Sequence, residues 1–341
     1  MTLEVPASAA PSGPPTRTRS ALDPAGSTGP GTGPGLPTGG ATRAKVTRVV
    51  SADVSVWQRM ADIWGSRELL TYLVRTEIKV KYKNSVLGLV WSMIAPAMTL
   101  AIYFIVFQYI ARNGVPHFVI FLFSGLLVWN LFQVGVQTGT GVVVNNAGLV
   151  KKVSFPREIL ALASMGSASV FFVFQAVVMV IFMVVLHSAP DWSYLPLVPL
   201  ALVAVLVLGS GLALVLSAVN VYLRDTQHLV EVLMTAWFWA CPIVYAFQAN
   251  IGNRLGPRGL TWLYFLNPLT PLVLSFQRAL YAHVVVGNTT SAAAAPLRVL
   301  PAHGFAWYAG LDLAVLAIGL VLFVVALAIF GRLEGNFAEE L

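Results

Sequence analysis

Long apolar runs recur along most of the chain and are separated by short polar connections. A helix needs about 20 apolar residues to cross the hydrocarbon layer of a membrane. Six runs approach this length, and none contains Asp, Glu, Lys or Arg; they cover residues 88–110, 118–136, 159–186, 196–219, 232–247 and 313–330. We therefore expect an all-α polytopic membrane protein with six transmembrane helices.

The pattern changes ahead of the first run, where basic and apolar residues take opposite faces of a predicted helix. Arg75, Lys79 and Lys83 share one face, whereas Leu69, Leu73 and Val80 share the other. A helix of this kind lies along a bilayer surface. Residues 78–83 also alternate with period two, as a strand does, but no partner strand is visible nearby. We favour an N-terminal amphipathic interface helix within residues 51–87.

A further apolar stretch, residues 259–282, is interrupted by Asn267-Pro268 and Thr270-Pro271. Proline removes a backbone donor and disfavours a helical conformation in the residue before it. Each half is therefore too short to cross. We predict a pair of re-entrant half-helices at the outer face, between spans five and six. The alternative is one kinked transmembrane helix, which would place the C-terminus outside.

Lysine and arginine gather at alternate connections between the predicted spans. They lie before the first span, between the second and third, and between the fourth and fifth: Arg75, Lys79, Lys81, Lys83, Lys151, Lys152, Arg157 and Arg224. The turn at residues 187–195 has none, and the first external loop has only Arg112. Because cytoplasmic loops carry the basic excess, we expect both termini in the cytoplasm and a multi-pass protein of the plasma membrane.

Composition supports this interpretation and removes others. The 341 residues are 57% hydrophobic and only 10% charged, unlike a soluble globule. The net charge is +7, and the Lys and Arg residues gather at the ends of the apolar runs. No motif that binds nucleic acid is present. Cys241 is the only cysteine, so an intramolecular disulfide is excluded and no metal site is expected.

The chain ends differ in composition from the apolar part. Residues 1–50 are rich in proline and glycine and predict a disordered cytoplasmic tail. They lack the basic-then-apolar start of a cleaved signal peptide. We therefore divide the chain into this tail, the interface helix region at 51–87, a permease domain at 88–333 and a cytoplasmic C-terminal tail at 334–341.

No enzyme site is evident in the sequence. There is no Gly-Lys pair, so a phosphate-binding loop of the Walker type is excluded and nucleotide energy must come from another polypeptide. Ion-coupled carriers usually keep ionisable groups at mid-membrane, where this chain has none. Asp191, Glu231 and Asp312 lie at span edges and form no evident acid/base pair.

The connection at residues 145–158, NNAGLVKKVSFPRE, mixes apolar and charged residues. A short helix there, parallel to the membrane, would suit docking into a cleft of a cytosolic partner. The alternative is that the charges only set topology. The candidate coupling residues are Asn145, Leu149, Lys151, Lys152, Phe155, Pro156, Arg157 and Glu158.

Aromatic residues are frequent on the predicted first, second and fifth spans. Near span ends such residues usually form an interfacial belt or pack between helices. Rings that face a pore would instead stack on sugar faces and give a polymer a smooth path. The candidate channel aromatics are Tyr103, Phe107, Trp129, Trp237 and Tyr245.

Several spaced motifs occur together in the order typical of one family. They are RTEIKVKYKNSVLGLVWSMIAP at 75–96, LVKKVSFPRE at 149–158, NVYLRD at 220–225, Trp237-Phe238 with Pro242-Ile243, and NPLTP at 267–271. Through them the chain resembles, over residues 66–333, the permease subunits of ATP-binding cassette type 2 exporters for O-antigen, teichoic acid and galactan. The long N-terminal tail departs from the compact family pattern.

The resemblance implies a homodimeric channel that a separate, homodimeric cytosolic ATPase drives. ATP and Mg²⁺ would bind that partner, and this chain would bind no cofactor. Residues 145–158 would form the coupling helix, and Asn267, Pro268 and Pro271 the external gate. A lipid diphosphate carrier would meet Arg75, Lys79, Lys81, Tyr82 and Lys83.

We therefore expect a permease subunit, without ATPase activity of its own, that exports a lipid-linked cell-surface polysaccharide. Its partners would be a second copy, the ATPase, the glycan and membrane lipids, with no nucleic acid. One alternative is an exporter of a small amphiphile or drug. Others are a membrane scaffold that does not transport and a polytopic glycosyl- or acyltransferase.

Overall fold

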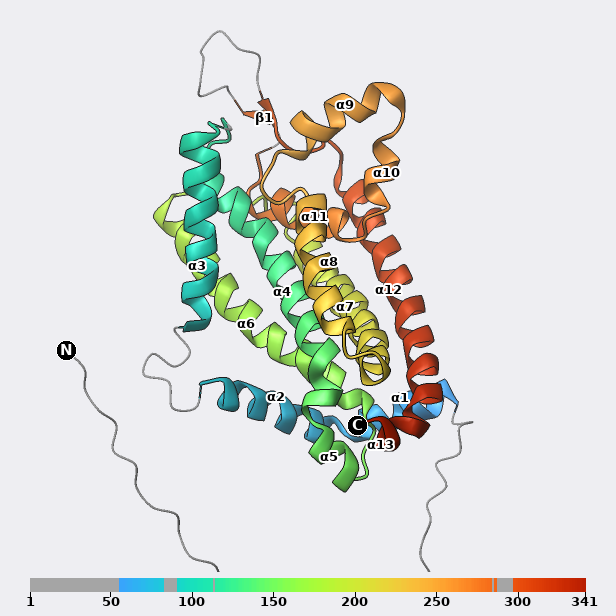
Figure 1. Ribbon diagram of the computed structural model, residues 1–341. Coiled ribbons are helices and arrows are strands. Elements are labelled where there is room, and N and C mark those ends of the chain that lie inside the picture. Colours follow the sequence, from blue (N-terminus) through green and yellow to red (C-terminus); the bar gives the residue numbers. More distant parts are fainter. Residues whose placement is uncertain (1–54, 83–90, 113, 284, 287–296) are drawn as a thin grey trace, which may run out of the picture. The chain divides into compact units, whose positions relative to one another are not determined.

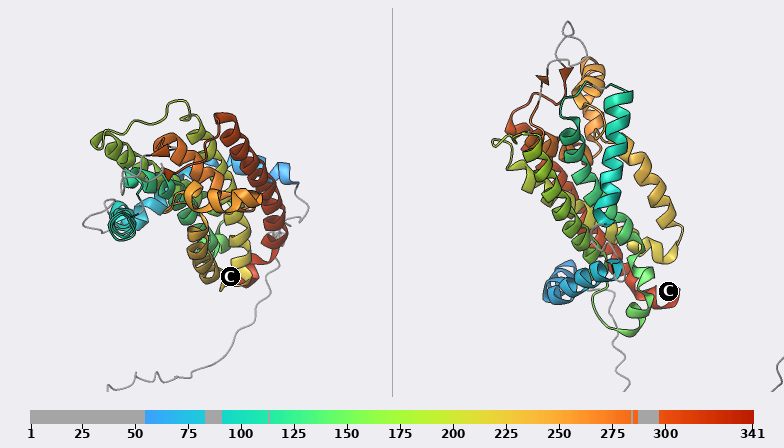
Figure 2. Two further views of the ribbon diagram at one scale, coloured as in Figure 1. Left: turned by 90° about the horizontal axis from the view of Figure 1, so that it is seen from above. Right: turned by 90° about the vertical axis from the view of Figure 1, so that its left-hand side faces the viewer.

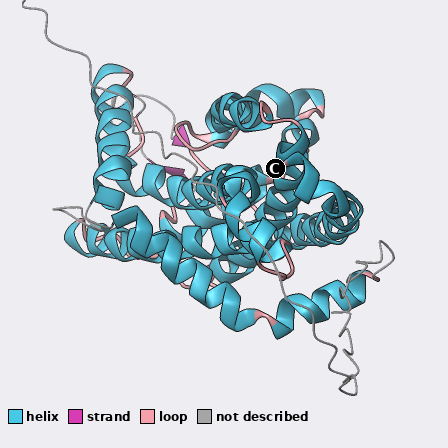
Figure 3. Cartoon of the chain, turned by 60° about the horizontal axis from the view of Figure 1, so that its bottom comes forward, coloured by secondary structure: helices cyan, strands magenta, loops and turns pink. Residues whose placement is uncertain are grey.

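A computed structural model describes residues 55–82, 91–112, 114–283, 285–286 and 297–341. The predicted N-terminal tail and Lys83 lie outside this part. The described chain is helical nearly throughout (Figure 3). It also contains one short antiparallel pair, β1 (Val285–Val286) with β2 (Leu297–Arg298).

Four helices are long and apolar enough to cross a membrane. They are α4 (Phe118–Asn145), α6 (Glu158–Val185), α7 (Leu197–Tyr222) and α12 (Phe305–Leu333), and they run side by side in a bundle (Figure 1). Helix α4 is the most deeply buried, whereas α6 and α12 keep wide exposed apolar faces. The prediction of an all-helical membrane protein is confirmed at this level.

Helices α7 and α12 approach each other closely because two glycines meet the opposite backbone. A Cβ atom added at Gly211 would lie 3.0 Å from the backbone nitrogen of Phe323. One added at Gly319 would lie 3.1 Å from the backbone nitrogen of Leu208. Small residues of this kind allow close packing between helices inside a membrane.

The first and fifth predicted spans take less regular forms. Helix α3 (Trp91–Phe104) contains Pro96 and continues as the π-helix η2 (Ile105–Ile110). Helix α8 (Thr226–Ala240) has 15 residues, which is about 22 Å of helix. It ends at Cys241, where the backbone becomes extended, because Pro242 follows and disfavours a helical conformation there.

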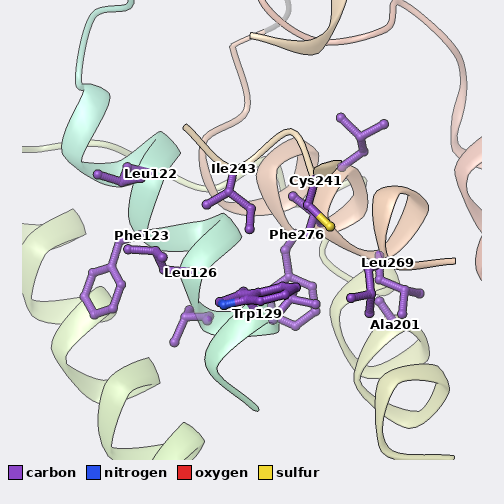
Figure 4. Packing of buried hydrophobic residues seen from close by; sticks show 14 of the residues in the cluster. Leu122, Phe123, Leu126, Trp129, Ala201, Cys241, Ile243, Leu269 and Phe276 are labelled. Atoms are coloured by element: carbon purple, nitrogen blue, oxygen red, sulfur yellow. The ribbon is translucent and has the colours of Figure 1, made fainter. Parts of the chain in front are cut away.

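The interrupted apolar stretch forms two helices, α10 (Thr261–Phe265) and α11 (Leu269–Leu280), with a break before Leu269. Three short elements precede them: η3 (Gln248–Gly252), α9 (Asn253–Leu255) and η4 (Gly256–Arg258). Helix α11 is buried from residue 269 to residue 279. In Figure 4, its Leu269 and Phe276 lie among Trp129 of α4, Ala201 of α7 and Cys241.

Short helices gather at the opposite end of the bundle, which we call the α5 end; the other is the α10 end (Figure 1). The α5 end holds α1 (Val56–Gly65), α2 (Arg67–Tyr82), α5 (Ala147–Lys152), η5 (Glu334–Asn336) and α13 (Phe337–Glu340). Helices α1 and α2 run across the bundle (Figures 1 and 2). Residues 78–82 belong to α2, so the strand alternative for them is wrong.

Candidate functional site

Helix α2 presents a basic face away from the bundle. The side chains of Arg75 and Lys79 are exposed, and Lys81 and Tyr82 belong to its last turn. On the other side α2 packs on α6, where a Cβ atom added at Gly166 would lie 2.7 Å from Val74 Cγ2. The helix is thus amphipathic, as the spacing of its basic residues predicts.

The apolar side of α2 differs from the prediction at one position. Leu69 and Leu73 are half-buried, whereas Val80 is 66% exposed. Val80 lies in the last turn of the helix, six residues after Val74, whose side chain meets α6 at Gly166.

A short helix is present in the predicted coupling segment. Helix α5 follows Asn145, and its Val150 is buried while Leu149 packs beside it. Lys151 and Lys152 are exposed. The segment therefore attaches to the bundle through apolar side chains and directs its two lysines outward.

The end of the same segment faces inward. Phe155 and Pro156 are half-buried. Arg157 donates to the backbone oxygen of Glu334 at 2.8 Å, and the carboxylate of Glu158 lies 2.5 Å from Arg59 Nη1 of α1. Glu158 is only 2% exposed, and its carboxylate is bonded within the chain.

Arg59 and Glu334 were not singled out by sequence reasoning. Arg59 falls on the apolar face of α1, between the half-buried Val56 and Ile63. A charge on the apolar face of an amphipathic helix is the signal that identifies such a residue. Glu334 carries no comparable signal, because it follows a long apolar run in an ordinary polar tail.

Four of the five predicted channel aromatics belong to one series of ring contacts. Tyr103 of α3 stacks on Phe238 of α8, with ring centroids 5.5 Å apart. Phe238 meets Trp129 of α4 at 5.5 Å. The series continues through Trp129–Phe132 and Phe132–Trp237, and Tyr103 also contacts Phe107.

Packing inside this chain accounts for part of that series. Trp129 is 3% exposed and its indole Nε1 donates to Gln133 at 2.7 Å. Trp237 is half-buried and lines an apolar groove of about 430 Å³ between α7 and α8. Trp239 is 51% exposed and touches Tyr103, so it is more exposed than the rings of the series.

Tyr245 lies apart from the series. Its hydroxyl group bonds to that of Tyr264 in α10 and donates to the backbone oxygen of Trp239. It therefore joins the end of α8 to the short helices of the α10 end.

The break before α11 is held by Asn267. Its Oδ1 accepts from Trp237 Nε1 at 2.9 Å and from the backbone nitrogen of Leu269 at 3.1 Å. Its Nδ2 donates to the backbone oxygen of Ala240 at 3.2 Å. Pro268 and Pro271 stand at the start of α11, where Pro271 is buried. The break thus links α8 to α11.

The sequence did not predict two polar contacts at the α10 end. Arg278 of α11 lies 2.7 Å from the carboxylate of Asp191 and 3.7 Å from the ring centre of Tyr194. Asp312 was predicted as an edge residue but lies fully buried, about two turns into α12. It accepts from Ser275 Oγ of α11 at 3.0 Å. The helix begins earlier than the charge-free run, because Phe305 to Leu311 continue it.

Among the described residues, no group of three or more His, Cys, Asp or Glu side chains is placed to hold a metal ion. The α5 end instead carries the basic helix α2 and the short helix α5 with its two exposed lysines. The series of aromatic contacts lies within the bundle, and the hydrogen bonds of Asn267 hold the break before α11.

The profile of the family described as ABC-2 type transporter matches residues 68–281. The chain is 27% identical over 274 residues to the O-antigen export system permease protein RfbA of Klebsiella pneumoniae, covering 80% of this chain and 95% of that protein. It is 31% identical over 222 residues to the protein of the same name from Myxococcus xanthus, covering 65% of this chain and 84% of the relative. The chain therefore belongs to the ABC-2 type transporter family.

Proposed function

We propose that this chain is the membrane subunit of an ATP-driven exporter that moves a lipid-linked cell-surface polysaccharide outward across the plasma membrane. The observation that carries the proposal is its similarity to a permease named for O-antigen export over 95% of that permease's length. The family match at residues 68–281 includes both chain segments that we assign to partners.

The α5 end is assigned to the cytoplasm. Every lysine in the described part of the chain lies there: Lys79, Lys81, Lys151 and Lys152. A basic excess of this kind marks the cytoplasmic side of membrane proteins. Both termini are then cytoplasmic.

Six segments cross the membrane in this proposal. Helices α4, α6, α7 and α12 supply four of them. Residues 91–110 make about 30 Å of helix and supply another, and α8 together with the chain to Phe247 supplies the last. Helices α1 and α2 lie along the cytoplasmic surface, and α10 and α11 form the re-entrant pair. Irregular backbone at this depth is tolerated because protein surrounds it.

A cytosolic ATPase dimer provides the energy and binds ATP and Mg²⁺. It docks on α5 of each of two copies of this chain, where Lys151 and Lys152 are exposed. Nucleotide binding would shift the pair of permease subunits between two conformations. In that cycle this chain changes conformation and carries the cargo, and the ATPase performs the hydrolysis.

The lipid diphosphate carrier meets the basic face of α2. Arg75 and Lys79 are exposed on that face, and their side chains suit a phosphate group at the cytoplasmic leaflet. The glycan then passes along a path between the two copies that includes the exposed ring of Trp239. Pro268 and Pro271 mark the external gate.

Deletion of this chain in its native host tests the proposal. Lipid-linked glycan should accumulate inside the cell and disappear from the surface, and the full chain supplied in trans should restore display. Restoration should require an ATPase partner with an intact nucleotide site.

Normal surface glycan in the deletion strain would contradict glycan export. If the same strain also became more sensitive to toxic amphiphiles, a small-molecule exporter would be favoured instead.

A further inference from the structure

Four charged side chains from three separate segments meet at the α5 end. Arg59 Nη1 lies 2.5 Å from Glu158 Oε1 and 3.1 Å from Glu334 Oε2. Arg157 Nε lies 3.6 Å from Glu334 Oε1. We call these four residues the charge cluster. It joins α1, the last two residues of the coupling segment, where α6 begins, and the residue that directly follows α12.

The charge cluster is built inside the protein rather than on its surface. Arg59 is 8% exposed and Glu158 is 2% exposed. Burial alone would lower the pKa of Arg59, but hydrogen bonds and charge from Glu334 and Glu158 outweigh it and raise the pKa. The guanidinium group therefore stays charged, and two positive charges balance two negative ones.

The surroundings leave little freedom for the arginine. A Cβ atom added at Gly331 of α12 would lie 2.5 Å from Arg59 Cζ, so the side chain lies directly against the helix. Beyond it, Phe337 is fully buried and Arg157 Cζ lies 5.9 Å from its ring centre. Tyr222 donates to the backbone oxygen of Leu333 at 2.7 Å. The end of α12 is thus fixed on both sides of Glu334.

Stability alone is a weak reason for such an arrangement. Buried ion pairs are often no better than apolar side chains of similar volume, because desolvation offsets the attraction between charges. What they do provide is a fixed relative orientation of the groups that they join. Chains of packed side chains and ion pairs of that kind carry coupling between distant sites.

We propose that Arg59 is a positioning residue for energy coupling, which makes α1, the coupling segment and the end of α12 move as one body. The proposal rests on the proposed function, because α5 is taken as the element that the ATPase displaces. When α5 moves, Glu158 carries Arg59 with it, and Arg59 carries Glu334 and the end of α12. Arg59 itself touches neither cargo nor nucleotide.

A distance measurement tests whether these elements move together. Spin labels are attached at Trp57→Cys on α1 and Gly148→Cys on α5, both exposed positions. The full chain is assembled with its ATPase in lipid vesicles, and labelled chains are diluted with unlabelled ones. Cys241 is fully buried and stays unlabelled. The distance within one chain should stay constant on addition of a non-hydrolysable ATP analogue, and should shift or broaden with it in Arg59→Ala.

Transport is measured on the same samples. In Arg59→Ala, glycan exported per ATP hydrolysed should fall about tenfold, with ATPase binding retained. Arg59→Lys keeps the charge and should recover part of the loss. Arg332→Ala is the matched control, since it removes an exposed arginine from the same end of α12 and should change neither measurement.

The outcomes separate the two proposals. Export per ATP at the wild-type level in Arg59→Ala would overturn the role of Arg59. So would a label distance that changes with the ATP analogue in the wild-type chain, or one that stays constant in Arg59→Ala. Absence of ATP-driven glycan export by the wild-type chain would instead overturn the proposed function. If Arg59→Ala does not fold, Glu334→Gln removes one charge at the less buried side, with Glu339→Gln as its exposed control.

Discussion

A single side chain, that of Asn267, satisfies the end of one helix and the start of another. Its amide group bonds to the backbone of Ala240 at the end of α8 and of Leu269 at the start of α11. Helix termini leave backbone groups without partners, and a capping side chain supplies them. The same amide accepts a hydrogen bond from Trp237, so it also holds the ring of this candidate channel aromatic.

Asn267→Ala should lower the free energy of unfolding by about 1–2 kcal/mol, because hydrogen bonds between helices in a membrane have modest individual strength. The thermal midpoint in detergent measures the loss. Asn253→Ala, an exposed asparagine at the same end, should leave the midpoint unchanged. Equal midpoints for both variants would show that the bonds of Asn267 contribute nothing.

Residue identity in the sequence predicted some of these contacts and not others. The Asn267-Pro268 pair revealed the break through backbone chemistry alone. The partners of Arg59, Arg278 and Asp312 remained hidden, because each lies in a segment distant along the chain. Pairing of that kind depends on how helices pack, which periodicity does not encode.

At the scale of elements, periodicity identified the long helices well and their ends less well. Helix α4 extends nine residues past the predicted end at Val136, because Gln137 to Asn145 remain helical although they are more polar. Helix α8 ends at Ala240, seven residues before the predicted end at Phe247, because Pro242 follows its C-cap residue. Helix α11 was expected at the outer face but is buried from residue 269 to residue 279. Its Ser275 bonds to the fully buried Asp312, and its Arg278 pairs with the half-buried Asp191.

The pair formed by α7 and α12 should be sensitive to added volume. Gly211→Ala brings a methyl group to about 3 Å from the backbone of Phe323, and should cost about 1–3 kcal/mol of stability because the helices must separate. Gly310→Ala in α12 is the control, since a Cβ atom there meets nothing within 4 Å. Thermal unfolding should distinguish the two variants, and similar midpoints would argue against backbone contact at Gly211.

Charge reversal on α2 should block transport without disturbing the fold. In the double variant Arg75→Glu with Lys79→Glu, both side chains are exposed, so packing is retained while attraction to a phosphate group is lost. Surface glycan should fall about tenfold or more, with subunit assembly unchanged on size-exclusion chromatography.

The matched control for that variant is Arg254→Glu with Arg258→Glu, which reverses two exposed arginines at the α10 end. It should leave surface glycan near the normal level. Normal display in the α2 variant would rule out the basic face as the place where the lipid carrier binds.

For the molecule as a whole, the exposed surface of the bundle is itself largely apolar. Helices α3, α6, α8 and α12 all present large exposed hydrophobic side chains, as expected where lipid or a second subunit covers them. The sequence predicted this class of molecule from composition and run length. The sequence predicted partners only through family resemblance. Exposed residues alone do not show which partner would bind them.

All lysines of the described bundle lie at one end. An amine-reactive reagent that cannot cross membranes therefore reports which end of the chain faces the cytoplasm. Intact cells should give no modified chain, whereas inside-out vesicles should give strong modification at Lys151 and Lys152. Arg258→Lys places an amine at the opposite, exposed end. That variant should react from outside the cell, and modification of the natural chain from outside would reverse the assigned orientation.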